Sequence, residues 1–169
     1  MLNIEGFTMF DNHDADLTME KSGAVFIARV TALIVSGGRF LAVENVNHPD
    51  MYYTVGGRIR FGEDTMAAVL REAREETGHP FEIDRLRFVE ESFFILHDKK
   101  FHLINFHYLM KSSGDINIAD GTATDQPESE RLVWLDINSL NKYNLKPSFL
   151  KTADLLGLAT VEHIITKEY

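Results

Sequence analysis

The sequence contains no cysteine among its 169 residues. Disulfide bonds, thiolate metal sites and cysteine nucleophiles are therefore excluded, so any bound metal must be held by oxygen or imidazole ligands. Positive charge is also scarce, because 17 basic residues stand against 26 acidic ones, a formal net charge of −9. Nucleic acids and anionic membranes are bound through basic patches, and we expect neither as a partner. An acidic protein can still bind phosphates through a bridging divalent cation.

Long apolar runs are missing as well. No stretch approaches the roughly 18 consecutive apolar residues of a membrane span, and the first residues do not resemble a secretory signal, so we expect a cytoplasmic protein. A content of 44% hydrophobic residues suits one globular domain. We expect residues 1–22 to be an N-terminal extension or edge strand and residues 23–169 to form that domain.

The most informative stretch covers residues 56–79, GGRIRFGEDTMAAVLREAREETGH. Apolar or small residues at spacings of four, three and four predict a helix over 65–77 with one buried stripe. The stripe consists of Met66, Leu70, Ala73 and Thr77. Asp64 can cap the start, Gly78 suits the left-handed residue after the last turn, and Pro80 prevents the helix from resuming.

Three glutamates form an acidic face on this helix. Glu72, Glu75 and Glu76 stand at i, i+3 and i+4, so their carboxylates project in one arc. Most runs of this kind are solvated helix surfaces, in which Arg71 pairs with a glutamate one turn later. The preceding loop favours a site instead, because its glycines deliver Glu63 to the mouth of the helix, where exposed amides stabilise a carboxylate. Four clustered carboxylates suit Mg²⁺ or Mn²⁺.

The stretch resembles the Nudix box, Gly-x5-Glu-x7-Arg-Glu-aliphatic-x-Glu-Glu-x-Gly-aliphatic, of hydrolases that act on nucleoside diphosphates linked to another group. The seven fixed positions are filled by Gly57, Glu63, Arg71, Glu72, Glu75, Glu76 and Gly78. Ala73 is small for an aliphatic site, His79 replaces the last aliphatic residue, and Val55 stands where many members have proline. These departures leave every acid in place, so we expect the chemistry to survive them.

The resemblance implies an α/β fold, an α/β/α sandwich with a mixed β-sheet and a loop-helix-loop catalytic box. It also implies a Mg²⁺ cofactor, with Mn²⁺ as the alternative. The implied metal ligands are Glu72, Glu75 and Glu76. The implied catalytic residues are Glu63 and Arg71, which support and position the glutamates, with Glu72, Glu128 or Glu130 as the general base.

Residues outside the acidic helix are candidates for binding substrate. They are Arg29, Tyr52, Arg58, Arg60, Phe93, Phe94 and His102. The three arginines suit phosphate oxygens, with a sheet edge or solvent as the competing location. Tyr52 or its neighbour Tyr53 alternates toward the box from a short strand over 51–55, and the paired phenylalanines offer a platform for a base. His102 is expected in a pocket or in the core.

The remaining pattern predicts mostly strands. A strand over 24–35 is expected to form a hairpin with residues 39–44, and two long antiparallel strands are expected over 81–96 and 101–111. The loop over 112–126 could close over a ligand before a strand that carries Trp134 into the core. A final helix is expected from Pro147 through Leu156.

The function implied is metal-dependent hydrolysis of a pyrophosphate bond in a small nucleotide diphosphate derivative. Residues 93–97, FFILH, lack the proline that often marks ADP-ribose hydrolases and the tyrosine that often marks dinucleoside polyphosphate hydrolases in the resembling family. Nucleotide sugars, ADP-ribose and nucleoside triphosphates therefore stay open as substrates, and a homodimer stays open as the assembly.

Two other functions are weighed against hydrolysis. A catalytically silent nucleotide-sensing module of the same fold is the main alternative, although such a module need not retain its carboxylates and this chain retains all of them. An isopentenyl diphosphate isomerase of the same fold would need a catalytic cysteine, which this chain lacks.

Overall fold

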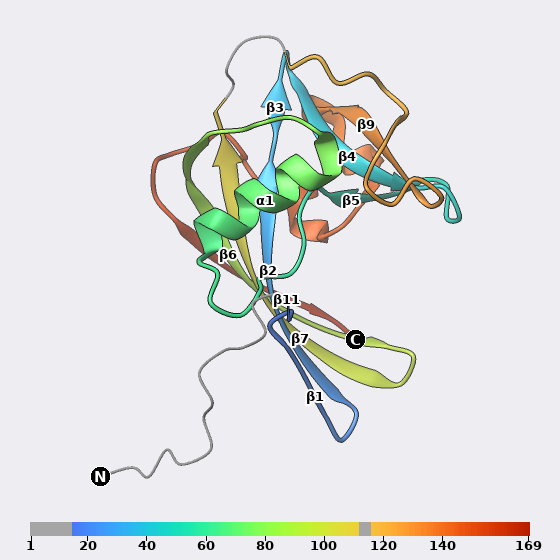
Figure 1. Cartoon of the computed structure of the whole chain (residues 1–169), viewed down its shortest axis with the longest axis vertical. Helices are drawn as coiled ribbons and strands as arrows, with labels where there is room; N and C mark the ends of the chain where they lie inside the picture. Colours follow the sequence, from blue (N-terminus) through green and yellow to red (C-terminus); the bar gives the residue numbers. More distant parts are fainter. Residues whose placement is uncertain (1–14, 112–115) are drawn as a thin grey trace.

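The computed structural model describes residues 15–111 and 116–169, and its two β-sheets enclose most of the core beside one α-helix (Figure 1). The strands are β1 (Thr18–Lys21), β2 (Ala24–Leu33), β3 (Val35–Ser36), β4 (Arg39–Asn45), β5 (Met51–Thr54), β6 (Ile83–Leu96), β7 (Lys99–Met110), β8 (Thr122–Ala123), β9 (Glu130–Asp136), β10 (Asn144–Leu145) and β11 (Glu162–Glu168). The helices are α1 (Thr65–Thr77) and the 3-10 turns η1 (Ile137–Lys142) and η2 (Ser148–Lys151).

The first sheet has the strand order β1-β2-β7-β6-β11. Its centre is the antiparallel β6–β7 hairpin, which confirms the two long strands, and β2 lies parallel to β7. The expected single strand over 24–35 is divided, because the chain passes at Ile34 from β2 in this sheet to β3 in the second sheet. Only the short β3 therefore forms the predicted hairpin with β4.

Helix α1 begins and ends where the sequence predicts. The Asp64 side chain accepts hydrogen bonds from the backbone N–H groups of Met66 and Ala67, and Gly78 ends the helix in the left-handed conformation. The predicted buried stripe is half wrong, since Met66 is 54% and Leu70 36% exposed. The helix instead buries Ala68, Val69, Ala73 and Thr77. Small side chains on this face let the helix lie close to β2.

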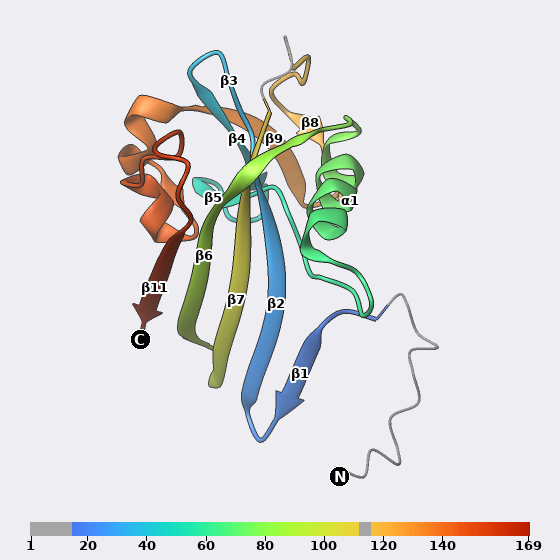
Figure 2. The same ribbon diagram turned by 90° about the vertical axis from the view of Figure 1, so that its left-hand side faces the viewer.

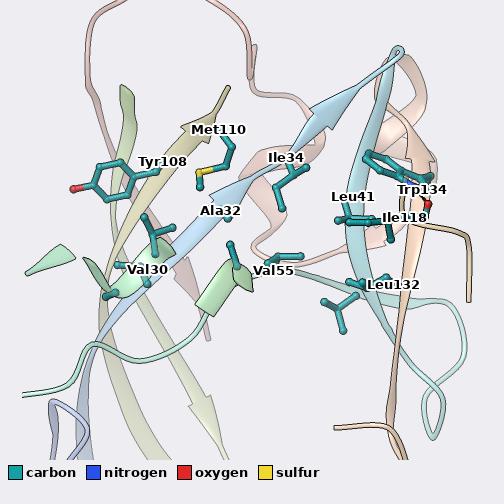
Figure 3. Packing of buried hydrophobic residues seen from close by; sticks show 14 of the residues in the cluster. Val30, Ala32, Ile34, Leu41, Val55, Tyr108, Met110, Ile118, Leu132 and Trp134 are labelled. Atoms are coloured by element: carbon teal, nitrogen blue, oxygen red, sulfur yellow. Dashed lines mark hydrogen bonds between the residues drawn. The ribbon is translucent and has the colours of Figure 1, made fainter. Parts of the chain in front are cut away.

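The core consists of two apolar clusters, one on each side of the first sheet. Figure 3 shows the α1-side cluster, to which β2 contributes Val30 and Ala32 and the link between β2 and β3 contributes Ile34. Trp134 joins this cluster and donates its indole N–H to the Ile118 carbonyl oxygen at 2.8 Å, so its predicted place in the core is confirmed. The other cluster gathers apolar residues of β6, β7 and the 3-10 turns.

The two faces of the first sheet are covered differently. Figure 2 shows α1 against one face and the orange 3-10 turns on the opposite side. The predicted helix from Pro147 to Leu156 is wrong in extent, because only Ser148–Lys151 form a 3-10 turn and Leu156 is 55% exposed. The mixed α/β architecture is confirmed, with 3-10 turns in place of a second α-helical layer.

The C-terminal strand β11 lies parallel to β6 and had no sequence prediction. Arg87 of β6 fixes the segment that leads into β11. Its guanidinium donates to the carbonyl oxygens of Asp154 and Thr160 and pairs with Glu162 at 2.7 Å. Nowhere in the described chain is a helix long and apolar enough to cross a membrane. Residues 1–14 and 112–115, parts of the predicted extension and loop, lie outside the described residues.

Candidate active site

The loop before α1 is fastened along the edge of β2. The backbone N–H of Val30 donates to the Gly57 carbonyl oxygen at 2.9 Å, and that of Ala32 donates to the Val55 carbonyl oxygen at 2.9 Å. Farther along, the Ile59 N–H donates to the Ala28 carbonyl oxygen at 3.1 Å. This short ladder fixes the loop against the sheet, and Asp64 then starts the helix beside it.

The paired glycines are required by close packing. Gly56 has a φ of +139°, and a Cβ added to it would lie 2.3 Å from the Val30 carbonyl oxygen. A Cβ added to Gly57 would lie 2.3 Å from Oε2 of Glu72. The first contact is with the main chain of β2 and the second with a carboxylate. The loop backbone thus forms one wall of the acidic site.

Arg71 connects the acids of the box. Its guanidinium bonds both carboxylate oxygens of Glu63, at 2.8 and 2.9 Å, and Nη1 donates to Glu72 at 2.7 Å and to Glu75 at 3.0 Å. The hydrogen bonds from Arg71 hold the pKa of Glu63 below its ordinary value. A forked guanidinium can grip carboxylates in this way because its donors lie in one plane. Arg71 therefore fixes the orientation of Glu72 from the side.

Glu76 is the least satisfied acid of the box. The Gly56 N–H donates to its Oε1 at 3.3 Å, while its Oε2 is buried without a hydrogen-bond partner among the described residues. Burial raises the pKa of Glu76 to about 8 and also raises the pKa of Glu72 above its ordinary value. Two desolvated carboxylates are stabilised by a nearby cation.

The raised pKa of Glu76 predicts a pH-dependent stability. A carboxyl whose pKa rises from 4.5 in the unfolded chain to about 8 in the folded one binds more protons when folded, so its contribution to stability is lost as pH rises between these values. The quantity to follow is the difference in unfolding free energy between the wild type and Glu76→Gln, measured in EDTA. We expect this difference to fall by a few kcal/mol as the pH rises between these two pKa values. Urea titrations between pH 5 and 8.5 measure this difference.

Taking the difference between wild type and Glu76→Gln cancels the contributions of other titrating groups. One of these groups is His107, whose pKa is lowered by burial. Since its folded pKa is depressed, His107 contributes stability that is lost as pH falls below about 6.5, the opposite direction to Glu76. Mg²⁺ added at pH 8 should restore part of the lost wild-type stability and leave Glu76→Gln less changed. A difference that stays flat from pH 5 to 8.5 would contradict the buried state of this carboxyl.

A cavity of about 470 Å³ opens beside the two desolvated acids. It is lined by Asp16, Arg29, Val43, Asn45, Tyr53, Thr54, Gly56, Gly57, Arg58, Glu72, Glu76, Asp125, Gln126 and Glu130. Of the predicted acids, Glu63 and Glu75 do not line it, because Arg71 holds both outside. Across the residues that the structure describes, no three acidic or histidine side chains are arranged to hold a metal ion as they stand.

The predicted arginines take three different positions. Arg29 lines the cavity, where burial lowers its pKa and its Nη2 donates to the Gly56 carbonyl oxygen at 3.2 Å. Arg58 also lines it and pairs with Asp16 at 3.0 Å. Arg60 lies 3.8 Å from Glu75, outside the cavity. Of the two predicted loop acids, Glu130 lines the cavity, and Glu128 is exposed and does not.

The placement of Tyr52 corrects one expectation. Its ring packs edge-on against Tyr143 at 5.6 Å and joins the second core cluster, whereas Tyr53 lines the cavity. Side chains alternate across a strand, so only one of the two neighbours can point into the site. The pairing of β5 with β4 decides which one, and that pairing is not visible in the local sequence.

Phe93 and Phe94 lie away from the acidic cavity, and so does His102, which lines a pocket as expected but a different one. They line a separate, largely apolar hollow of about 740 Å³ at the far ends of β2, β6 and β7. Cross-strand pairing puts Phe93 opposite His102, and their rings stack with centroids 4.3 Å apart. None of the three lines the acidic cavity. These residues belong to the β6–β7 hairpin, which extends away from α1 (Figure 2).

Sequence reasoning also missed part of the cavity wall. The missed polar residues are Asp16, Asn45, Thr54, Asp125 and Gln126. Asp125 and Gln126 belong to the loop that we expected to close over a ligand. The sequence therefore indicated this loop, but not which of its residues line the cavity. The other three come from separate strands or connections, and only the folded sheet brings them to the box.

Comparisons with known proteins agree with the box. The model of the NUDIX domain matches residues 25–155 of this chain. The MutT NUDIX hydrolase of Burkholderia pseudomallei is similar, with 25% identity, coverage of 67% of this chain and 84% of that chain, and a TM-score of 0.53. A search of curated proteins finds no significant match.

Two further solved structures share the fold. The mutator MutT protein of Bacillus halodurans has 17% identity, a TM-score of 0.57, and coverage of 78% of this chain and 83% of that chain. The MutT protein of Methanosarcina mazei has 22% identity, a TM-score of 0.53, and coverage of 74% and 88%. The predicted Nudix-type fold is thereby confirmed. With the matching domain model and the complete box, the chain belongs to the NUDIX domain family.

Proposed function

We propose that the protein hydrolyses a pyrophosphate bond in a nucleoside diphosphate linked to a second group, with Mg²⁺, or alternatively Mn²⁺, held by Glu72 and Glu76. The observation that carries this proposal is the buried Oε2 of Glu76, which has no hydrogen-bond partner among the described residues and lies in the same cavity as Glu72. A carboxylate in that condition is costly unless a cation or proton satisfies it. The family match supports the reaction class.

The donor set fits Mg²⁺. This ion prefers oxygen ligands and is usually held by one or two carboxylates, with water and substrate phosphates in the remaining positions. When bound, it would neutralise charge on the diphosphate and orient water for attack at phosphorus. Glu75 stays the third candidate ligand, although its 41% exposed side chain is bonded to Arg71 and would have to turn to reach the same ion.

The remaining groups of the chain have separate tasks. Among the described residues the Arg29 guanidinium donates only to Gly56, which leaves donors that would bind a phosphate oxygen. Arg71 would hold Glu63 and Glu72 in position. Glu130 is the best-placed general base, because it lines the cavity and its Oε2 accepts from the Thr124 hydroxyl at 3.2 Å. Exposed Glu128 is the weaker candidate.

A small substrate panel tests the function. Release of nucleoside monophosphate would be measured from UDP-glucose, ADP-ribose, UTP and ATP with Mg²⁺, with Mn²⁺ and in EDTA. We expect turnover of at least one compound and loss of at least about 100-fold in EDTA. Asp98→Asn, at the exposed turn between β6 and β7, serves as an unaffected control. No turnover of any compound, with tight binding of one, would instead support a nucleotide-sensing module.

A further inference from the structure

We propose that the substrate is a nucleoside diphosphate whose second phosphate carries a neutral, hydroxyl-rich group, that is, a nucleotide sugar in the broad sense, and that nucleoside triphosphates are disfavoured. This inference rests on the proposed function of the same cavity. It chooses among the substrate classes by the charge and chemistry of the part of the cavity lining that comes from neither α1 nor the glycine loop.

The cavity is strongly acidic for a phosphate-binding site. Five carboxylates line it against two guanidinium groups, a formal balance of −3. Arg58 is already paired with Asp16 at 3.0 Å, which leaves Arg29 as the one lining guanidinium without an ion pair among the described residues. A divalent cation held by Glu72 and Glu76 offsets the charges of these two carboxylates, so Arg29 supplies the remaining positive charge for a diphosphate. Little positive charge then remains for another phosphate.

The cavity has two chemically different walls. One is built from the glycine loop with Glu72 and Glu76 of α1, where the diphosphate would lie. The other is built from the end of β4, from β5 and from the segment that enters β9. Its polar side chains are Asn45, Tyr53, Thr54, Asp125, Gln126 and Glu130. This second wall contains two carboxylates and no basic residue among the described lining.

Such a wall suits hydroxyl groups better than phosphate. Carboxylate and amide oxygens accept hydrogen bonds from hydroxyls, and the Tyr53 ring, 38% exposed, offers a face for a sugar or base. A terminal phosphate would bring its negative charge close to Asp125 and Glu130, which repel it.

Asp125 is the most informative residue of this wall. Its exposed side chain lines the cavity and has no hydrogen-bond or ion-pair partner among the described residues, so its charge is available to a ligand. Glu130, in contrast, already accepts a hydrogen bond from Thr124 and is a candidate base. Changing Asp125 therefore alters the selectivity of the wall with little effect on the fold.

The test compares kcat/KM for pairs that share a nucleoside, UDP-glucose against UTP and ADP-ribose against ATP. The wild type should prefer the sugar compound by about tenfold or more in at least one pair. Asp125→Asn should narrow that ratio, and Asp125→Lys should narrow it further by raising turnover of the triphosphate. Asp98→Asn makes the same change in net charge far from the cavity wall and should leave the ratio unchanged.

Each other outcome has a distinct meaning. Turnover of a triphosphate that equals or exceeds that of its sugar partner in both pairs would overturn the substrate inference and leave the hydrolase proposal standing. Turnover of none of the four compounds would overturn the hydrolase proposal itself. A ratio that does not change in Asp125→Lys would overturn the assignment of this wall to the group beyond the diphosphate.

Discussion

Glu76→Gln is expected to lower kcat by about 10²- to 10⁴-fold at saturating Mg²⁺ while the protein stays folded. Glutamine keeps the shape of the side chain and can still accept the Gly56 N–H, so the loop contact survives. It removes the negative charge from the buried Oε2 position, where a cation would be held. Steady-state kinetics across a Mg²⁺ titration measure the loss, and circular dichroism confirms folding.

Glu75→Gln is the matched comparison on the same helix. Glu75 does not line the cavity and bonds Arg71 from the exposed side, so its loss should cost less than that of Glu76. Near-wild-type turnover of Glu76→Gln at saturating Mg²⁺ would refute the proposed metal site. Equal losses in both variants would mean that Glu75 turns inward and binds the ion together with Glu76.

Alanine substitutions of the two paired glycines should have different effects, one on activity and the other on stability. In Gly57→Ala the new Cβ meets the carboxylate of Glu72, the flexible end of a side chain, so Glu72 is displaced and the fold is kept. We expect activity to fall about 100-fold, because a shift of about 1 Å in a catalytic group has costs of this size. Thermal unfolding should change little.

In Gly56→Ala the new Cβ meets the Val30 carbonyl oxygen and the Thr31 Cα, both main-chain atoms, at a φ that side chains rarely adopt. The main chain of β2 can move away only at a large cost in free energy. We therefore expect a loss of about 3 kcal/mol or more in unfolding free energy. Urea unfolding and kcat, measured on both variants, separate the effects. A folded and active Gly57→Ala would mean that Glu72 does not need its observed position.

Local signals predicted helix α1 well. Asp64 and Gly78 define its two ends in the sequence and in the structure, because caps depend only on nearby backbone groups. Which face the helix buries was harder to predict, since Leu70 continued a plausible apolar stripe yet lies 36% exposed. The close approach of α1 to the glycine loop favours Ala68 and Ala73 against the sheet instead.

Long-range pairing accounts for the other errors. The choice between Tyr52 and Tyr53 depends on how β5 pairs with β4, and the location of Phe93 depends on how far the β6–β7 hairpin extends. The C-terminal strand β11 exists because β6 offers it an edge and Arg87 holds the preceding segment. Residues from separate strands, such as Asn45 and Asp125, therefore reach one cavity without any shared sequence signal.

The small side chain at residue 73 also sets a spacing. Ala73 is fully buried between α1 and the strands beneath it, one residue after Glu72 and three before Glu76. A larger aliphatic side chain there would lift the helix axis and carry both carboxylates away from the loop backbone. We therefore expect the volume of the side chain at residue 73 to influence the distance between the α1 carboxylates and the glycine loop.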